Sequence, residues 1–191
     1  LNDYYLGKLD EHRRDSSYLN KSIYILLQNG CANSEAFFSY CEASYAIRPN
    51  FLNSFGCALA SKVYKMRDEM IKYFEEAYRY AENSLQRGTM AYHIGMSMLT
   101  SRPRDPETKK PYPKNSPQFT EWLSNTTTAI SNLKKVVELH DVFSSCSDLD
   151  ARLYPATAAN NIAQYTNTIA AALESLDLCR EAAQYAQITT Q

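Results

Sequence analysis

The sequence predicts an all-α protein built from antiparallel helical hairpins stacked in a row. Apolar residues recur at helical spacing through most of the chain. Glycine (5) and proline (7) are scarce, whereas a β-sandwich of this size needs many turns and more of both. Two successive hairpins also match each other after a shift of 34 positions. Because 191 residues suffice for about four or five hairpins, we expect a single helical-repeat domain over residues 1–191.

The composition limits the classes of partner. An apolar fraction of 45% with 21% charged residues is ordinary for a folded soluble protein. The 20 basic and 21 acidic residues nearly cancel, so nucleic acid is not expected as a partner, since phosphate binding needs clustered positive charge. No run approaches about 20 apolar residues, and no membrane span is expected. The 15 tyrosines fall mostly in helical patterns, which indicates partly buried faces and interfaces.

The first elements along the chain are a partial helix and a complete hairpin. Residues 1–14 have the pattern of one helix, or half of a hairpin. The first complete unit covers about 15–50. Its first helix stops at Gly30, a residue type that favours helix ends, and its second follows the N-cap Ser34. Pro49 ends the unit because the residue before a proline avoids the helical conformation.

The second and last units have the same order of helix, turn and helix. The second covers about 51–84, and we expect a polar break between its helices at Arg67 and Asp68. The last covers about 154–189 and follows a polar break at 144–150.

The third unit, residues 88–140, is interrupted. One helix is expected over 88–100, and the helical period returns over 119–140. Between them, residues 101–118 hold five of the seven prolines and almost no apolar residues. This composition is typical of a loop, and a loop of this length inside a compact domain is often functional.

The repeat is visible in both helices of the first two units. In the second helices, a small or apolar residue, an aromatic residue and an alanine recur 34 positions later; the pairs are Ala36 with Met70, Tyr40 with Phe74 and Ala43 with Ala77. In the first helices, Ser22 recurs as Gly56 at the same shift. An amphipathic helix can produce one such match, but the same shift in both helices indicates a true repeat.

This pattern resembles the tetratricopeptide repeat (TPR). The residues that carry the resemblance are Leu52, Phe55, Gly56, Leu59, Phe74 and Ala77, then Ala91, Ile94, Gly95 and Met98, then Ile162, Ala163, Ser175, Cys179 and Ala182, with Pro49 closing the first unit. Small residues let the two helices of a hairpin pack closely. The resemblance implies stacking into a right-handed superhelix. The chain departs from the family in the insertion, in turns about two residues longer and in Cys179, which replaces the usual aromatic.

The resemblance also implies a concave groove lined by the first helix of each hairpin. The partner-binding residues expected from it are Asn50, Asn53, Tyr92, Met96, Asn160, Gln164 and Asn167. Asparagine and glutamine can hold a peptide backbone by hydrogen bonds in both directions, and the Tyr and Met can receive an apolar side chain. We therefore expect a protein or peptide partner; the alternative is a solvated polar face without a ligand. No Lys or Arg pair occupies these positions, so a clamped chaperone carboxylate is not expected.

The insertion is a second candidate contact. Its basic residues and its single tyrosine, which stands among prolines, form the set Arg102, Arg104, Lys109, Lys110 and Tyr112. Such a loop can dock onto an acidic neighbour. The alternative is a tolerated excursion of the chain without a partner.

No motif for catalysis, metal or cofactor is present. The chain lacks a glycine-rich phosphate loop, HExxH and GxSxG. Five cysteines are an odd number, none are spaced as CxxC, and the three histidines are scattered. Cys57 and His93 lie on successive first helices, but packing explains each more simply. We expect no enzyme, no metal and no cofactor. Cysteines at sites that suit a small apolar residue favour a reducing compartment; the location is otherwise unknown.

Three functions remain open. The first is a non-enzymatic scaffold or adaptor that binds a peptide or partner helix. The second is a permanently packed subunit of a larger assembly, favoured by the unpaired helix over 1–14. The third is a small secreted, disulfide-linked bundle that resembles the plant invertase and pectin methylesterase inhibitors. Cys31 and Cys41, separated by nine residues, resemble a first disulfide pair of that family, but the other three cysteines do not follow its spacing.

Overall fold

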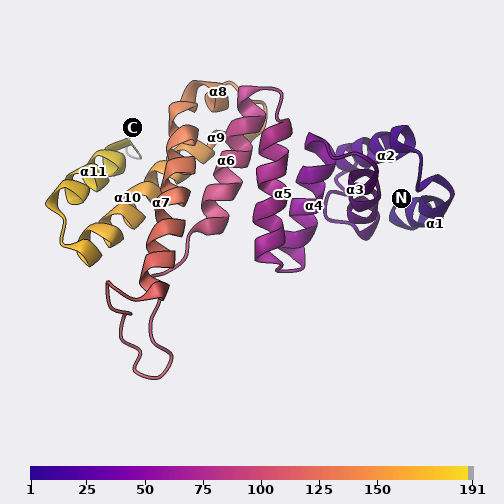
Figure 1. Cartoon of the computed structure of the whole chain (residues 1–191). Helices are drawn as coiled ribbons and strands as arrows, with labels where there is room; N and C mark the ends of the chain where they lie inside the picture. Colours follow the sequence, from indigo (N-terminus) through magenta and orange to yellow (C-terminus); the bar gives the residue numbers. More distant parts are fainter. Residues whose placement is uncertain (189–191) are drawn as a thin grey trace. The chain divides into compact units, whose positions relative to one another are not determined.

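A computed structural model describes residues 1–188 of the chain, and it is helical with short connections (Figure 1). Within those residues there are eleven helical segments and no β-strand, apart from an isolated bridge between Arg104 and Pro111. The prediction of an all-α chain is confirmed. The chain forms two compact units, Leu1–Glu82 and a second that begins at Asn83. The expectation of one domain over 1–191 stays a prediction, and its last residues, like the end of the last unit at 189, lie outside the described part.

The first unit contains five helices. They are α1 (Asn2–His12), α2 (Ser16–Gln28), α3 (Glu35–Ile47), α4 (Phe51–Val63) and α5 (Arg67–Tyr80). From α2 onward each helix packs against the next one along the chain, and α1 packs against α3. The unit therefore contains two helix–turn–helix pairs, preceded by the extra helix that the sequence predicts.

Local signals fix the ends of these helices. Gly30 has a φ of +70° in the turn after α2, a conformation that glycine adopts without strain. The Ser34 side chain accepts a hydrogen bond from the Phe37 backbone N–H at 3.2 Å and caps α3. The predicted break at Arg67 and Asp68 is wrong by a few residues, because both residues already belong to α5. Asp68 lies in the first turn of α5, where its negative charge interacts favourably with the positive end of the helix dipole.

The core of the first unit lies between α2, α3 and α4. Leu19, Ile23 and Leu26 of α2 have no exposed surface. The Tyr40 side chain is also fully buried, and its hydroxyl donates a hydrogen bond to the Tyr5 carbonyl of α1 at 3.0 Å. Because a buried hydroxyl without a partner is costly, this bond fixes α1 on the rest of the unit.

Helix α4 packs tightly against its neighbour at Gly56. A Cβ atom at Gly56 would overlap the Sγ of Cys41 and lie 2.9 Å from its Cβ, both on α3. The small residue is thus required, as the repeat predicts. The atoms nearest to an added Cβ belong to α3 of the preceding pair rather than to the hairpin partner α5. Helix α4 packs against both of these helices.

The second unit contains six helical segments within the described residues. They are α6 (Ser84–Met98), α7 (Pro117–Glu138), α8 (His140–Ser144), α9 (Leu149–Arg152), α10 (Tyr154–Leu173) and α11 (Leu176–Ile188). Helix α7 packs between α6 and α10, and α11 packs against α10. The predicted polar break at 144–150 lies between two short helical turns, α8 and α9, which overlap only its first and last residues. None of the helices within residues 1–188 has the length and apolarity that crossing a bilayer requires.

Glycine again permits a tight helix contact in this unit. A Cβ at Gly95 of α6 would lie 2.8 Å from the Cγ of Leu133 on α7. Leu133 has no exposed surface, so it has no free space into which to move. Here the small residue faces its own hairpin partner, as the repeat predicts.

The predicted insertion is a non-helical hairpin that extends beyond the ends of α6 and α7 (Figure 1). Backbone hydrogen bonds join Asp105 N–H to the Lys110 carbonyl at 2.9 Å and Tyr112 N–H to the Pro103 carbonyl at 3.2 Å. The predicted boundary at 118 is too late, because α7 begins at Pro117. Proline is favoured at the first helical position, where its missing N–H has no partner to lose.

We predict that Gly56→Ala lowers the free energy of unfolding by about 1–3 kcal/mol, because the added methyl overpacks a filled contact. The matched control is Gly7→Ala in α1, where nothing lies within 4 Å of the new Cβ. There alanine should raise stability by about 0.5–1 kcal/mol through its helix propensity. Urea unfolding followed by circular dichroism measures both. Equal stabilisation by the two changes would show that α3 and α4 are not in close contact.

Candidate partner-binding surfaces

The expected partner-binding residues divide between the two units. Asn50 and Asn53 belong to the first unit, and the other five belong to the second.

Asn53 is a structural residue rather than a surface contact. It has 0% exposure. Its amide nitrogen donates to the Ser44 hydroxyl and to the Arg48 carbonyl, both at 3.0 Å, and its amide oxygen accepts from the Asn50 backbone N–H at 2.8 Å. The expectation that Asn53 contacts a partner is therefore corrected. The residue occupies the third position of α4, where a capping box turns its side chain back toward the chain.

Tyr92 and Met96 lie on α6 and are partly buried. The Tyr92 ring stacks on Tyr154 with centroids 4.0 Å apart and planes 5° apart. Burial raises the pKa of the Tyr92 hydroxyl above its ordinary value, although a hydrogen bond with Thr157 acts in the opposite direction. Packing against α10 therefore occupies much of the Tyr92 ring, which leaves less of it for a partner.

Asn160, Gln164 and Asn167 come together on one exposed face of α10. They are spaced four and three residues apart, which places them on the same side of a helix. They line a groove of about 370 Å³ whose remaining walls come from small residues of α10 and α11, namely Ala163, Cys179, Ala182, Ala183 and Ala186. Among the described residues, none of the three side-chain amides has a hydrogen-bond partner. This is the one group of predicted residues that shares a groove; we call it the amide groove.

The basic loop has both structural and exposed residues. The guanidinium of Arg102 lies 5.2 Å from the centre of the Phe119 ring and donates to the Tyr112 carbonyl at 3.4 Å, so it anchors the loop. Arg104 is exposed and donates to the Lys109 carbonyl at 3.2 Å. The Lys109 and Lys110 side chains are exposed. The surface available to a partner therefore consists mainly of Arg104, Lys109 and Lys110.

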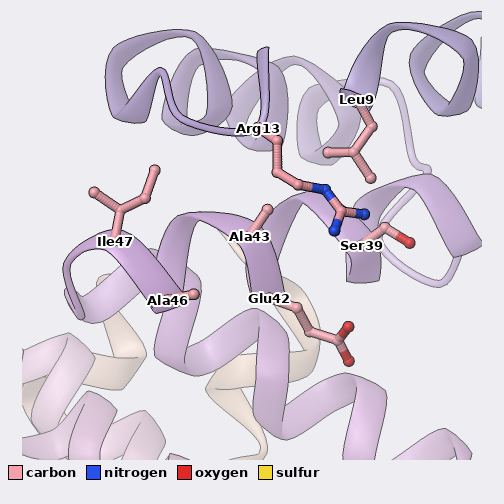
Figure 2. A pocket seen from close by; sticks show the side chains of 7 residues that line it. All are labelled: Leu9, Arg13, Ser39, Glu42, Ala43, Ala46 and Ile47. Carbon is pink, nitrogen blue, oxygen red and sulfur yellow. The ribbon is translucent and has the colours of Figure 1, made fainter. Parts of the chain in front are cut away.

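The sequence did not indicate a pocket between α1 and α3 (Figure 2). Its volume is about 350 Å³, and its lining residues are Leu9, Arg13, Ser39, Glu42, Ala43, Ala46 and Ile47. In Figure 2, Leu9 and Arg13 point from one wall toward α3, and Arg13 extends over Ala43 and Ser39. Arg13 also lies 3.5 Å from the carboxylate of Asp10. The small residues Ser39, Ala43 and Ala46, spaced four and three apart, were the available signal, but the same spacing is typical of a packed helix interface.

Asn50 lies in a separate cleft of about 590 Å³ at the start of α2 and α4. Its lining residues are Ser16, Asn20, Arg48, Pro49, Asn50, Phe51, Tyr80 and Glu82. The Asn50 amide nitrogen donates to the Asn20 amide oxygen at 3.4 Å. Sequence reasoning found Asn50 but not its neighbours, because they come from three separate segments.

The buried thiols are poorly suited to nucleophilic chemistry. Burial, followed by the carboxylates of Glu42 and Glu76, raises the pKa of Cys57 to about 12. Burial also raises the pKa of Cys41 well above its usual value. Since the thiolate is the reactive form, both remain protonated near neutral pH. All five cysteines are free, and within residues 1–188 no three His, Cys, Asp or Glu side chains gather as a metal site would require.

Comparison of the chain with protein-family models, with curated proteins and with solved structures finds no match. The resemblance to the tetratricopeptide repeat therefore rests on the spacing of residues. The candidate surfaces rest on their geometry and chemistry.

We predict that Asn53→Ala and Asn160→Ala differ sharply in stability. The first leaves the buried partners of Asn53 unsatisfied and should cost about 1–3 kcal/mol. The second removes an exposed amide and should change stability by less than about 0.5 kcal/mol. Urea unfolding measures both values. A neutral result for Asn53→Ala would contradict its role as a buried capping residue.

We predict that iodoacetamide labels Cys179 at least tenfold faster than Cys57 in the folded chain at pH 8. Cys179 is exposed, whereas Cys57 is buried and its pKa is raised to about 12, so its thiolate is scarce below that pH. Quenched labelling followed by peptide mass spectrometry measures the two rates. Labelling in urea is the control, where the rates should converge. Equal rates in the folded chain would overturn the assignment of Cys57 to the core.

Proposed function

We propose that this chain is a non-enzymatic interaction scaffold that holds a peptide or partner helix in the amide groove between α10 and α11. The observation that carries the proposal is the exposed row of unpaired amides on Asn160, Gln164 and Asn167. An amide side chain offers two donors and an acceptor, as a peptide backbone group requires.

The spacing of the row suits an extended segment. Helix geometry separates Asn160 from Gln164 by about 6 Å along the axis, because each residue rises about 1.5 Å. In an extended peptide, residues on the same side repeat about every 6.7 Å. A strand-like segment along α10 would therefore present backbone groups near these two amides in turn. The alanines of α11 leave room for its backbone to approach closely.

The architecture that we propose for this scaffold is a TPR-like right-handed superhelix. Two observations support it. In each unit the main helices pack in chain order, and the glycines Gly56 and Gly95 stand where neighbouring helices come closest. The shift of 34 positions between the first two hairpins gives the same order from the sequence.

The basic loop supplies a second proposed contact, to an acidic patch on the partner. Arg104, Lys109 and Lys110 stand on a hairpin held by backbone hydrogen bonds. A positive surface attracts an acidic one over roughly a Debye length, so its main effect would be on the rate of association.

A permanently packed subunit is the second candidate function. Three leucines favour it: Leu149 is 70% exposed, Leu153 62% and Leu176 76%. Leucines exposed to this extent often mark protein interfaces when they gather in a patch. The disulfide-linked inhibitor has no such support, because Cys31 and Cys41 are free.

Selection from a random peptide library displayed on phage tests the scaffold proposal. Peptides enriched on the chain should bind at least tenfold more weakly to the triple variant Asn160→Ala, Gln164→Ala, Asn167→Ala, since each lost hydrogen bond weakens binding by about 0.5–1.5 kcal/mol. The matched control replaces three exposed amides outside the groove, Gln28, Asn115 and Gln118, with alanine and should bind as the parent does.

Two results would contradict the scaffold proposal. One is the absence of any enriched peptide, and the other is equal binding of enriched peptides by the groove variant and the control. A permanent subunit should instead self-associate through its exposed leucines, which size-exclusion chromatography at several concentrations would detect.

A further inference from the structure

The cleft at the start of α2 and α4 has a chemistry that the proposed function does not use. It measures about 590 Å³ and is built entirely from the first unit. Ser16 and Asn20 come from α2, Arg48 and Asn50 from the connection before α4, and the remaining walls from α4 and the end of α5. None of its lining residues belongs to the amide groove.

Internal hydrogen bonds fix the two amides of the cleft. The Asn20 oxygen accepts from the Ser44 hydroxyl at 2.9 Å and from the Asn50 amide at 3.4 Å. The Asn50 oxygen accepts from the Asn53 backbone N–H at 3.1 Å. The Asn20 nitrogen donates to Ser16 at 3.4 Å. Because each amide nitrogen carries two hydrogens and uses one here, the unused groups of both amides are mainly N–H donors.

Arg48 adds a positive charge to the cleft, and a hydrogen bond holds its backbone in place. Its side chain is exposed and makes no hydrogen bond or ion pair with any described residue. Its backbone is extended, with φ −158° and ψ 111°, as expected before Pro49. The Arg48 carbonyl accepts the bond from the buried Asn53 amide at 3.0 Å, which holds the backbone below the guanidinium in place.

The remaining walls are aromatic, with one carboxylate. The Phe51 ring stacks on Phe55 with centroids 6.1 Å apart and planes 8° apart, so its position is fixed. Tyr80 is the last residue of α5, and its side chain is exposed. Glu82 also lines the cleft, but it already has an interaction of its own. The amino ends of α2 and α4 add a weak positive potential.

We infer that this cleft binds an oxyanion, a carboxylate or phosphoryl group, carried on an aromatic or aliphatic body. The unused groups are a guanidinium and amide N–H donors, which pair with anionic oxygens rather than with a second donor. The rings of Phe51 and Tyr80 provide apolar surface for the body of the ligand. Free anions without such a body should bind more weakly, because they leave this surface uncovered.

Titration of the 15N-labelled full chain tests the inference. The probes are N-acetylphenylalanine as its carboxylate, phenyl phosphate and the neutral N-acetylphenylalaninamide. Both anions, or one of them, should shift the side-chain signals of Asn20, Asn50 and Arg48 saturably. The tighter of the two identifies the source of the oxyanion. The neutral amide has the same ring without the charge and should produce no saturable shift of these signals.

Two variants complete the test. Arg48→Gln removes an exposed charge and should weaken binding of the anion about tenfold or more, since the anion loses a hydrogen bond to a charged donor. Arg13→Gln removes the same charge from an exposed position outside the cleft and should bind as the parent does. The inference is overturned if neither anion gives saturable shifts, if the neutral amide binds equally well, or if Arg48→Gln binds with unchanged affinity.

Discussion

The close approach of neighbouring helices at glycine is the constraint on which the rest of the structure depends. At Gly56 the backbone of α4 lies against Cys41 of α3, and at Gly95 the backbone of α6 lies against Leu133 of α7. Both contacts are too tight for any side chain. Helices held at this distance bury their small and apolar faces against each other. Each helix therefore presents its remaining, polar face to solvent or to a partner.

The candidate sites follow from which faces are left. Helix α10 buries Ile162 and Thr166, whereas its exposed face carries Asn160 and Gln164 beside the small residues of α11. In the first unit, the connection between α3 and α4 is fixed by the buried Asn53, and this places Arg48 and its amide neighbours around one cleft. In both places the packed side of an element determines the chemistry of the exposed side. In the cleft of the first unit, hydrogen bonds hold the amide groups of Asn20 and Asn50 in place.

The helices and most of their ends could be predicted from the sequence because local signals determine them. Gly30, Ser34 and Pro49 mark turns whatever the rest of the chain does. The break before α5 was misplaced because a polar pair can end one helix or begin the next, and no local rule separates the two. The amides of α10 were expected from the resemblance to the repeat, and their spacing of four and three residues places them on one side of the helix. These are features within about one or two turns of helix.

The features that could not be predicted depend on contacts between distant segments. Asn53 was expected at the surface because the resemblance to the tetratricopeptide repeat places it in the groove. Its burial depends on Ser44 and on the Arg48 carbonyl, which no spacing rule brings together. Arg102 was expected to contact a partner, but it lies on Phe119 across the base of the loop. The two pockets of the first unit are likewise assembled from separate helices.

The most direct measurement of the helix packing is a set of nuclear Overhauser contacts from the α protons of Gly56 and Gly95. We predict strong contacts from Gly56 to the Cys41 β protons and from Gly95 to the Leu133 methyl groups. If all these signals are assigned and the contacts are absent, the close packing of the helices at the two glycines is contradicted.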